Sequence, residues 1–325
     1  MKAVVYERFG SPEVLHLQEV TKPVPKDDEV LVRIYATTVT SADVRIRAKR
    51  MPAGFGIIAP LVFGFRKPRN PILGVEFAGV IEQVGREVTT FKIGDAVFGI
   101  HGAGMRCYAE YKTIKASGPI ALKPDAIPFE EAAAIPFGGG TALHFLRQGK
   151  VTAGEKVLII GASGSVGNAA VQLARSMGAE VTGVCSTANV ELVKSLGADH
   201  VVDYTIEDFR RSVLKYDVVM ETIGLYGFTD CKSVLKKNGR FIPIAGGLPD
   251  FAKMAWTNLT DSRKTIARVV TENAEDQRTI AGLAVAGTYK VVIDRTWPLE
   301  EISEAHRYVD TGRKRGNVVI RVMEL

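Results

Sequence analysis

Three glycines within seven residues, in the stretch GASGSVG at 161–167, stand between an apolar run and a helical pattern. KVLII precedes the loop, and apolar residues recur at helical spacing after it, from Val166 to Met177. A pyrophosphate needs a tight turn, close approach of the backbone, and a helix N-terminus whose free N–H groups favour anions. We therefore predict a dinucleotide-binding strand–loop–helix unit; the alternative is that the glycines only permit close packing of helix and strand. The residues expected to contact the dinucleotide are Gly161, Ser163, Gly164, Ser165, Val166 and Gly167.

The middle of the chain alternates short apolar runs with helical patterns. The runs are KVLII, EVTGVC, HVVDY, YDVVMET and RFIPIAG. Continuous apolar runs separated by helices indicate parallel strands that are buried on both faces and joined by right-handed crossovers. We expect a doubly wound α/β domain here, over residues 120–288.

The two ends of the chain follow a different pattern. EVLVRIYATTV, GVEFAGVIEQVG and KIGDAVFGI alternate apolar and polar residues, as antiparallel strands do. Near the C-terminus, VVIDRTW and GNVVIRV return to strand character around a helical pattern. We therefore predict that residues 289–325 rejoin residues 1–119 in one β domain. A chain of 325 residues is long enough for two such domains.

Composition narrows the class of protein. Hydrophobic residues make up 46% of the chain and charged residues 24%, which is typical of a globular protein. The start lacks the pattern of a signal peptide and no run reaches ~18 apolar residues, so we expect a cytoplasmic location. The net charge of +6 suits a phosphate-rich ligand, and without an RNA-binding signature we expect no nucleic-acid partner.

The segment after EVTGVC bears on the choice between NADPH and NADH. An NAD-selective site places a carboxylate there for the ribose hydroxyls, but this chain has Cys185, Ser186 and Thr187. A 2′-phosphate thus avoids a repulsion of about 1 to 4 kcal/mol at ~4 Å. We expect NADPH, with NADH bound more weakly. The donors available to the phosphate are Ser186, Thr187, Tyr204 and the basic run GRKRG, which includes Arg315.

Residues 51–71, MPAGFGIIAPLVFGFRKPRNP, interrupt the β pattern with a long loop rich in glycine, proline and aromatic residues. Loops of this length usually form lids or binding loops. Arg66, Lys67 and Arg69 flank the apolar residues. A peripheral membrane contact is therefore the alternative to a lid over a substrate cleft.

Motifs spread over nearly the whole chain resemble the medium-chain dehydrogenase/reductase superfamily, in its zinc-free quinone oxidoreductase branch. They are GVEFAGVIEQVG, GDAVFG, AEY, EEAAAIPFGGGTALHFL, GASGSVGNAAVQLARSMGAEV, LGADHVVDY and GNVVI. The resemblance implies a GroES-like catalytic domain, a Rossmann domain and a cleft between them for the nicotinamide. It also implies that no metal is bound, because Ser41 and Val75 stand where zinc-dependent relatives have a Cys and a His.

The resemblance also assigns residues to the cleft. Thr40, Ser41 and Arg45 would face the substrate, with Thr40 or Ser41 polarising its carbonyl; for both hydroxyls the alternative is that they simply finish a strand. Thr141 and the turns ETIG and IAGG would flank the nicotinamide. Asn189 lies in the segment where relatives often hold the 2′-phosphate with a Lys or Arg. The residues of the two turns are Thr222, Ile223, Gly224 and Ala245.

These features predict the reaction class. Without zinc there is no Lewis acid to polarise an alcohol or ketone, so an acceptor that is already electrophilic fits better. We predict an NADPH-dependent enzyme that transfers hydride to a quinone or an α,β-unsaturated carbonyl. The alternative is an NADPH-binding protein with a structural or RNA-binding role and little turnover.

Relatives in this branch are often dimers that extend the Rossmann sheet across a two-fold axis. RKTIARVV, at 263–270, is an apolar run that suits such an edge strand. We therefore expect a homodimer.

Overall fold

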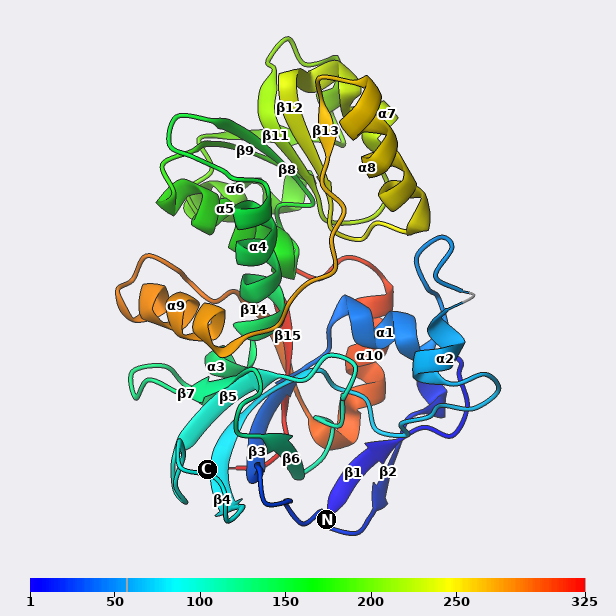
Figure 1. Ribbon diagram of the computed structural model, residues 1–325, viewed down its shortest axis with the longest axis vertical. Coiled ribbons are helices and arrows are strands. Elements are labelled where there is room, and N and C mark those ends of the chain that lie inside the picture. Colours follow the sequence, from blue (N-terminus) through cyan, green and yellow to red (C-terminus); the bar gives the residue numbers. More distant parts are fainter. Residues whose placement is uncertain (57, 325) are drawn as a thin grey trace.

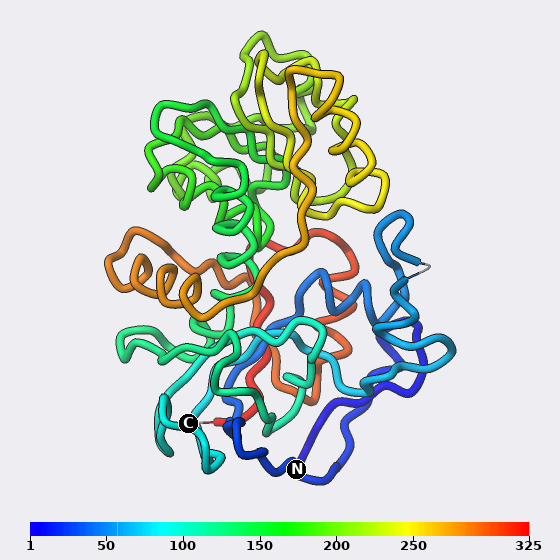
Figure 2. Tube along the Cα trace, in the orientation of Figure 1, coloured from blue at the N-terminus to red at the C-terminus, as the bar shows by residue number. Residues whose placement is uncertain are grey.

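The computed structural model describes residues 1–56 and 58–324, and its two large β-sheets lie at opposite ends of the molecule (Figure 1). Residue 57, within the predicted 51–71 loop, and residue 325, the last of the predicted β domain, lie outside the described residues. Both termini lie at the end that carries the seven-stranded sheet (Figure 2).

The middle of the chain forms a six-stranded sheet in which every pairing is parallel. The strand order is β10–β9–β8–β11–β12–β13. This is the order of a dinucleotide-binding Rossmann sheet, whose topology reverses between its first and fourth strands, so the predicted fold class is confirmed. The strands are β8 (Lys156–Ile160), β9 (Glu180–Cys185), β10 (His200–Asp203), β11 (Tyr216–Glu221), β12 (Leu235–Pro243) and β13 (Lys264–Thr265).

Both faces of this sheet are buried, which explains the continuous apolar runs. Ile159 of β8 packs into the core that contains Leu173 of α5. Its neighbour Leu158 points to the other face and packs with Phe228 of α7. The helices of this domain are α5 (Ser165–Ser176), α6 (Val190–Ser195), α7 (Phe228–Cys231) and α8 (Leu248–Thr260), with 3₁₀ turns at Thr187–Asn189, Phe209–Arg211 and Lys232–Val234.

The predicted edge strand at 263–270 lies at the sheet edge, but it is short. Only Lys264 and Thr265 form the ladder with β12. The chain then leaves the sheet and runs toward α9 at the other domain (Figure 1).

The two ends of the chain share one seven-stranded sheet. β15 pairs antiparallel with β3, with Val319 opposite Thr38. β7 pairs with β5 and lies just beyond the proposed boundary at residue 119. The strands are β3 (Glu29–Thr38), β4 (Glu76–Val84), β5 (Ala96–Ile100), β6 (Tyr111–Lys115), β7 (Ile120–Leu122), β14 (Ile293–Pro298) and β15 (Asn317–Arg321), while β1 (Lys2–Val5) pairs with β2 (His16–Glu19) apart from them.

The stretch FEEAAAIPFGGGTALHFLRQ, at 129–148, forms two helices, because Pro136 has no N–H for the preceding turn and starts a new helix. Glu76 of β4 accepts a hydrogen bond from the Phe137 N–H at 2.6 Å, which satisfies a free donor of that first turn. The remaining helices are α1 (Ser41–Arg47), α2 (Ala59–Phe63), α3 (Phe129–Ala133), α4 (Pro136–Gln148), α9 (Ala274–Val285) and α10 (Ile302–Asp310), with 3₁₀ turns at Pro12–Val14 and Leu299–Glu301.

Candidate functional site

The glycine loop lies at the carboxyl end of β8 and leads into α5. Gly161 has φ +81°, and a Cβ there would lie 2.6 Å from Thr222 Oγ1. A Cβ on Gly167 would lie 2.0 Å from the Gly161 carbonyl oxygen, so glycine lets α5 approach the loop closely. A Cβ on Gly164 would meet its nearest atom only at 3.5 Å. The loop therefore leaves room for a phosphate at the N-terminus of the 12-residue α5, where N–H groups and the helix dipole favour anions.

Residues after β9 and β10 surround the same end of the loop. Asn189 is buried, and its Nδ2 donates to Ser163 Oγ at 3.1 Å and to Ser186 Oγ at 3.2 Å. The Tyr204 N–H donates to the Cys185 carbonyl at 3.0 Å, while its side chain is exposed. The structure thus brings predicted phosphate and ribose residues from three segments to one edge of the sheet.

A carboxylate that the sequence reasoning missed lies beside them. Asp203 ends β10 opposite Cys185 of β9. Its Oδ1 accepts from Thr205 Oγ1 at 2.7 Å, and that hydroxyl pairs with Thr187 Oγ1 at 2.7 Å. Hydrogen bonds from Thr187 and Thr205 lower the pKa of Asp203. The segment after β9 has no carboxylate of its own, but the parallel register of the two strands brings one next to it.

The C-terminal segment packs against the glycine loop. The Gly316 N–H donates to the Ser163 carbonyl at 2.8 Å, which places the basic run 312–316 beside the loop. Arg315, predicted to meet the cofactor, is exposed there. Lys314 belongs to the same predicted run; its Nζ donates to the Gly316 carbonyl at 2.6 Å, and burial lowers its pKa to about 8.

A buried carboxylate shapes the turn after β11. Both oxygens of Glu221 accept from the Gly224 N–H, at 2.9 and 2.8 Å, and Oε1 also accepts from the Ile223 N–H at 3.3 Å. Burial raises the pKa of Glu221. The Thr222 hydroxyl donates to the Ile160 carbonyl at 2.8 Å. The turn is therefore fixed beside the glycine loop, with its threonine hydroxyl held by the backbone.

A cavity of about 300 Å³ lies between this turn and the first domain. Arg45 of α1 borders it, and its Nη2 donates to the Ile223 carbonyl at 3.5 Å. Burial lowers the pKa of Arg45, while the nearby Glu221 carboxylate raises it. The cavity is thus bordered both by Arg45, which was predicted to face the substrate, and by the turns that were predicted to flank the nicotinamide. Its lining includes Arg45, Met51, Ala53, Gly224, Ala245 and Gly246.

Thr40 and Ser41 begin α1 in different environments. Thr40 is the N-cap: its Oγ1 donates to Asp43 Oδ2 at 2.5 Å and accepts from the Asp43 N–H at 3.2 Å. Its hydroxyl therefore caps the N-terminus of α1. Ser41, in contrast, is half-buried at the first helical position. Thr141 of α4 borders a separate recess of about 90 Å³, so the structure does not place it in the cavity of Arg45.

Three family models match the chain, two of them over ranges that overlap. They are described as an alcohol dehydrogenase GroES-like domain, over residues 26–126, an alanine dehydrogenase/PNT C-terminal domain, over residues 134–237, and a zinc-binding dehydrogenase, over residues 196–320. The first of these confirms the expected GroES-like domain.

The whole chain also matches characterised proteins. It is 33% identical to a quinone oxidoreductase from Sus scrofa, over 94% of this chain and 93% of that protein. The chain belongs to the quinone oxidoreductase branch of the medium-chain dehydrogenase/reductase superfamily. It is 29% identical to an NADPH-dependent alkenal/one oxidoreductase, chloroplastic, from Arabidopsis thaliana, over 98% of this chain and 79% of that protein. The solved quinone oxidoreductase from Coxiella burnetii superposes with a TM-score of 0.88 at 29% identity, over 99% of both chains.

This chain lacks zinc-binding side chains at the positions of the catalytic zinc ligands in zinc-dependent members of the superfamily. Ser41 and the buried Val75 occupy the two positions at which the resemblance places the Cys and His of zinc-dependent relatives. Within residues 1–56 and 58–324, no group of three His, Cys, Asp or Glu side chains is arranged to hold a metal ion. Zinc independence stays a prediction.

Glu76 adjoins Val75 and is another carboxylate that the sequence reasoning did not single out. Its side chain is fully buried, accepts a hydrogen bond from the Thr38 hydroxyl, and holds the start of α4 through the Phe137 N–H. Burial raises its pKa to about 8. At neutral pH this carboxyl therefore stays largely protonated, so a charged group is not left unpaired in the core.

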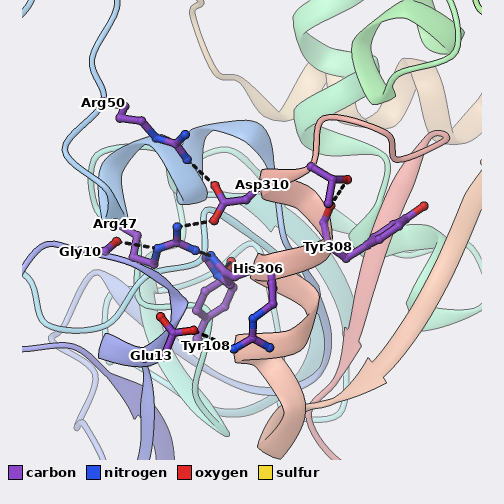
Figure 3. A network of polar contacts seen from close by, with 10 residues as sticks. Gly10, Glu13, Arg47, Arg50, Tyr108, His306, Tyr308 and Asp310 are labelled. Atoms are coloured by element: carbon purple, nitrogen blue, oxygen red, sulfur yellow. Dashed lines mark hydrogen bonds and ion pairs between the residues drawn. The ribbon is translucent and has the colours of Figure 1, made fainter.

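A buried polar network ties α1 to α10 (Figure 3). Arg47 is 1% exposed; its Nε donates to the Gly10 carbonyl and its Nη1 to His306 Nδ1, both at 3.1 Å. Because arginine only donates, His306 Nε2 carries the proton and donates to Tyr108 OH at 3.1 Å. Burial keeps the pKa of His306 well below its usual value, which matches a neutral ring. Asp310 completes the network by pairing with Arg47.

The predicted 51–71 loop lies beside the same cavity. It contains α2, and the Leu248 N–H at the start of α8 donates to the Ala53 carbonyl at 2.9 Å. The rings of Phe55 and Phe251 meet edge to face, with centroids 6.3 Å apart. The loop is thus anchored on the Rossmann domain. In the described part of the chain no helix is both long and apolar enough to cross a membrane.

Proposed function

We propose that this chain transfers hydride from NADPH to a quinone or an α,β-unsaturated carbonyl. The observation that carries the proposal is the common edge at which the glycine loop, the turn after β11 and the interdomain cavity meet. NADPH, which supplies the hydride, would be held by residues 161–167, Ser186, Asn189, Tyr204 and Arg315. The two relatives named for their reactions, one with quinones and one with alkenals and enones, support both acceptor classes.

The chain itself orients the acceptor and excludes water. Fixing two reactants in a dry cavity can supply about 7 to 11 kcal/mol of a barrier. Ser41 is the better hydroxyl for the acceptor carbonyl, because Thr40 already bonds to Asp43. Arg45 at the cavity wall would stabilise negative charge that develops on the acceptor oxygen. The proton would come from water or from Ser41, and Thr141 stays a proposed nicotinamide contact.

We also propose a modest preference for NADPH over NADH. The hydroxyls of Ser186 and Thr187 and the basic run 312–316 would meet the 2′-phosphate. Asp203 lies next to them, and its negative charge works against the phosphate even though Thr205 occupies one of its oxygens. The preference therefore depends on the balance between that carboxylate and the cations of the tail.

The test is NADPH consumption, followed by absorbance, with metal-free protein, a simple quinone, a simple enone and NADH in parallel. Faster turnover with NADPH than with NADH supports the proposal, and the better acceptor defines the substrate class. If NADPH binds but neither acceptor is reduced, with or without added zinc, the proposal fails and a binding role replaces it.

A homodimer is proposed as well. β13 forms an open edge of the Rossmann sheet, and Val269 after it is 74% exposed. Light scattering tests the proposal, and a monomer at all protein concentrations would contradict it. The cytoplasmic location stays a prediction.

A further inference from the structure

One surface segment concentrates the positive charge of the molecule. Residues 44–75 contain seven Lys and Arg residues and no Asp or Glu. The formal charge of this segment therefore exceeds the net charge of +6 of the whole chain. The exposed cations of this segment are Lys49, Arg50, Arg66, Lys67 and Arg69.

The same segment exposes large apolar side chains. Leu61 and Val62 of α2 are 57% and 43% exposed, Ile58 is 44% exposed, and Phe65 is 63% exposed. Ala59 is the member of α2 that faces the core. The helix α2 lies at the margin of the molecule, away from the two large sheets (Figure 1). Water therefore covers an apolar surface here that nothing in the described chain buries.

Cationic and apolar residues of this segment are close neighbours. Lys49 Nζ donates to the Phe65 carbonyl at 2.6 Å, so an ammonium group lies at an exposed aromatic residue. Gly64 has φ +109°, and a Cβ there would lie 2.1 Å from the Lys67 carbonyl oxygen. This tight turn brings Lys67 back toward α2, and the Arg69 N–H closes it on the Phe63 carbonyl at 2.8 Å.

We propose that Ile58, Leu61, Val62 and Phe65, with Lys49, Arg66, Lys67 and Arg69, form a docking surface for an anionic lipid bilayer. Apolar side chains at a membrane interface insert into the headgroup region, while surrounding cations bind anionic lipids. Charge complementarity favours an anionic bilayer over a purely apolar protein surface as the partner. An apolar protein surface would leave the cations of the segment without counter-charges.

The docking surface is continuous with the interdomain cavity. Met51 lines that cavity and also a recess of about 170 Å³ formed with Ala59, Pro60 and Phe63. A lipophilic acceptor dissolved in the bilayer would thus enter the cavity from the docked side. This second step rests on the proposed function, whereas docking does not.

Co-sedimentation of the full chain with vesicles tests docking without any turnover. We expect binding to phosphatidylcholine vesicles that contain phosphatidylglycerol, weak binding to phosphatidylcholine alone, and release at high salt. The double variant Arg66→Glu/Lys67→Glu should lower partitioning about tenfold or more, and Leu61→Asp/Phe65→Asp should lower it as well.

Matched controls lie on the Rossmann domain. Arg211→Glu/Lys237→Glu reverses two exposed cations, and Val213→Asp changes a side chain that is 91% exposed. These variants should bind vesicles as the unchanged protein does. Docking is overturned if anionic vesicles do not sediment the protein, or if the control variants lose binding to the same extent.

An activity arm separates docking from the proposed function. With a water-soluble quinone, the docking variants should turn over NADPH as the unchanged protein does. With a long-chain quinone in anionic vesicles, they should be slower by about the loss in partitioning. Vesicle binding without any turnover retains docking and rejects the proposed function, whereas equal rates with the vesicle-borne quinone overturn entry from the docked side.

Discussion

Among single residues, Gly161 of the cofactor loop has a matched control in Gly154, which lies outside the loop. Both have φ +81°, but a Cβ on Gly161 would lie 2.6 Å from Thr222 Oγ1 and from Ile223 Cγ2, whereas a Cβ on Gly154 meets no atom of the described residues within 4 Å. Alanine at either position costs about 1 kcal/mol or more in backbone strain. We expect Gly154→Ala to keep NADPH binding and Gly161→Ala to weaken it more than about tenfold. Fluorescence titration measures both, and equal affinities would contradict the assignment of this loop.

Glu76 gives a prediction for stability against pH. Burial raises its pKa from 4.5 to about 8, so the folded state binds this proton more tightly than the unfolded chain. Its contribution is therefore complete below about pH 4.5 and is lost as the pH rises through 8, with a slope of up to about 1.4 kcal/mol per pH unit. Glu76→Gln should remove this part of the decline.

Urea unfolding between pH 5 and 8 measures the difference between the two proteins. Asp43, whose pKa burial raises to about 6, titrates in both and so cancels in the comparison. Lys314, whose pKa is about 8, limits the useful range to lower pH. Parallel curves for the unchanged protein and Glu76→Gln would show that this carboxyl is already ionised in the fold.

Among secondary-structure elements, the tie between α1 and α10 depends on one carboxylate. Asp310 pairs with Arg47, which is 1% exposed, and with Arg50, which is 60% exposed. Asp310→Asn leaves the buried guanidinium without its counter-ion and should lower the free energy of unfolding by about 3 kcal/mol. Arg50→Gln removes only a surface pair and should change it by less than about 1 kcal/mol. Chemical denaturation compares the two, and similar losses would place the stabilisation outside the Arg47 pair.

The elements show what sequence can and cannot predict. Apolar periodicity located the parallel strands and the returning tail. A strand that is buried on both faces is a continuous apolar run, whereas a strand that is buried on one face alternates apolar and polar residues. The break before α4 is readable from Pro136, which lies in the first turn of that helix. Asp203, Glu221 and Glu76 were not predicted as members of the site, since their roles arise from strand register and from turns that bring distant N–H groups to one carboxylate. Such contacts are set by tertiary structure.

In the whole molecule, the glycine loop is hydrogen-bonded to the segment that returns to the first domain. The Gly316 N–H donates to the Ser163 carbonyl, and Ser165 Oγ donates to Asn317 Oδ1 at 2.6 Å, so the strand that returns to the first domain is bonded to the glycine loop. A ligand that orders the loop should therefore order the tail as well.

We expect NADPH to slow amide hydrogen exchange both in residues 161–167 and in residues 315–317, although about 150 residues of chain separate them. The hairpin of β1 and β2 packs away from the loop and serves as the internal control. At 100 times its Kd, NADPH should also stabilise the protein by about 2.7 kcal/mol, and NADH at the same concentration by less. Protection confined to the loop would mean that the tail contact is not coupled to the cofactor, and it would remove the basic run 312–316 from the proposed site.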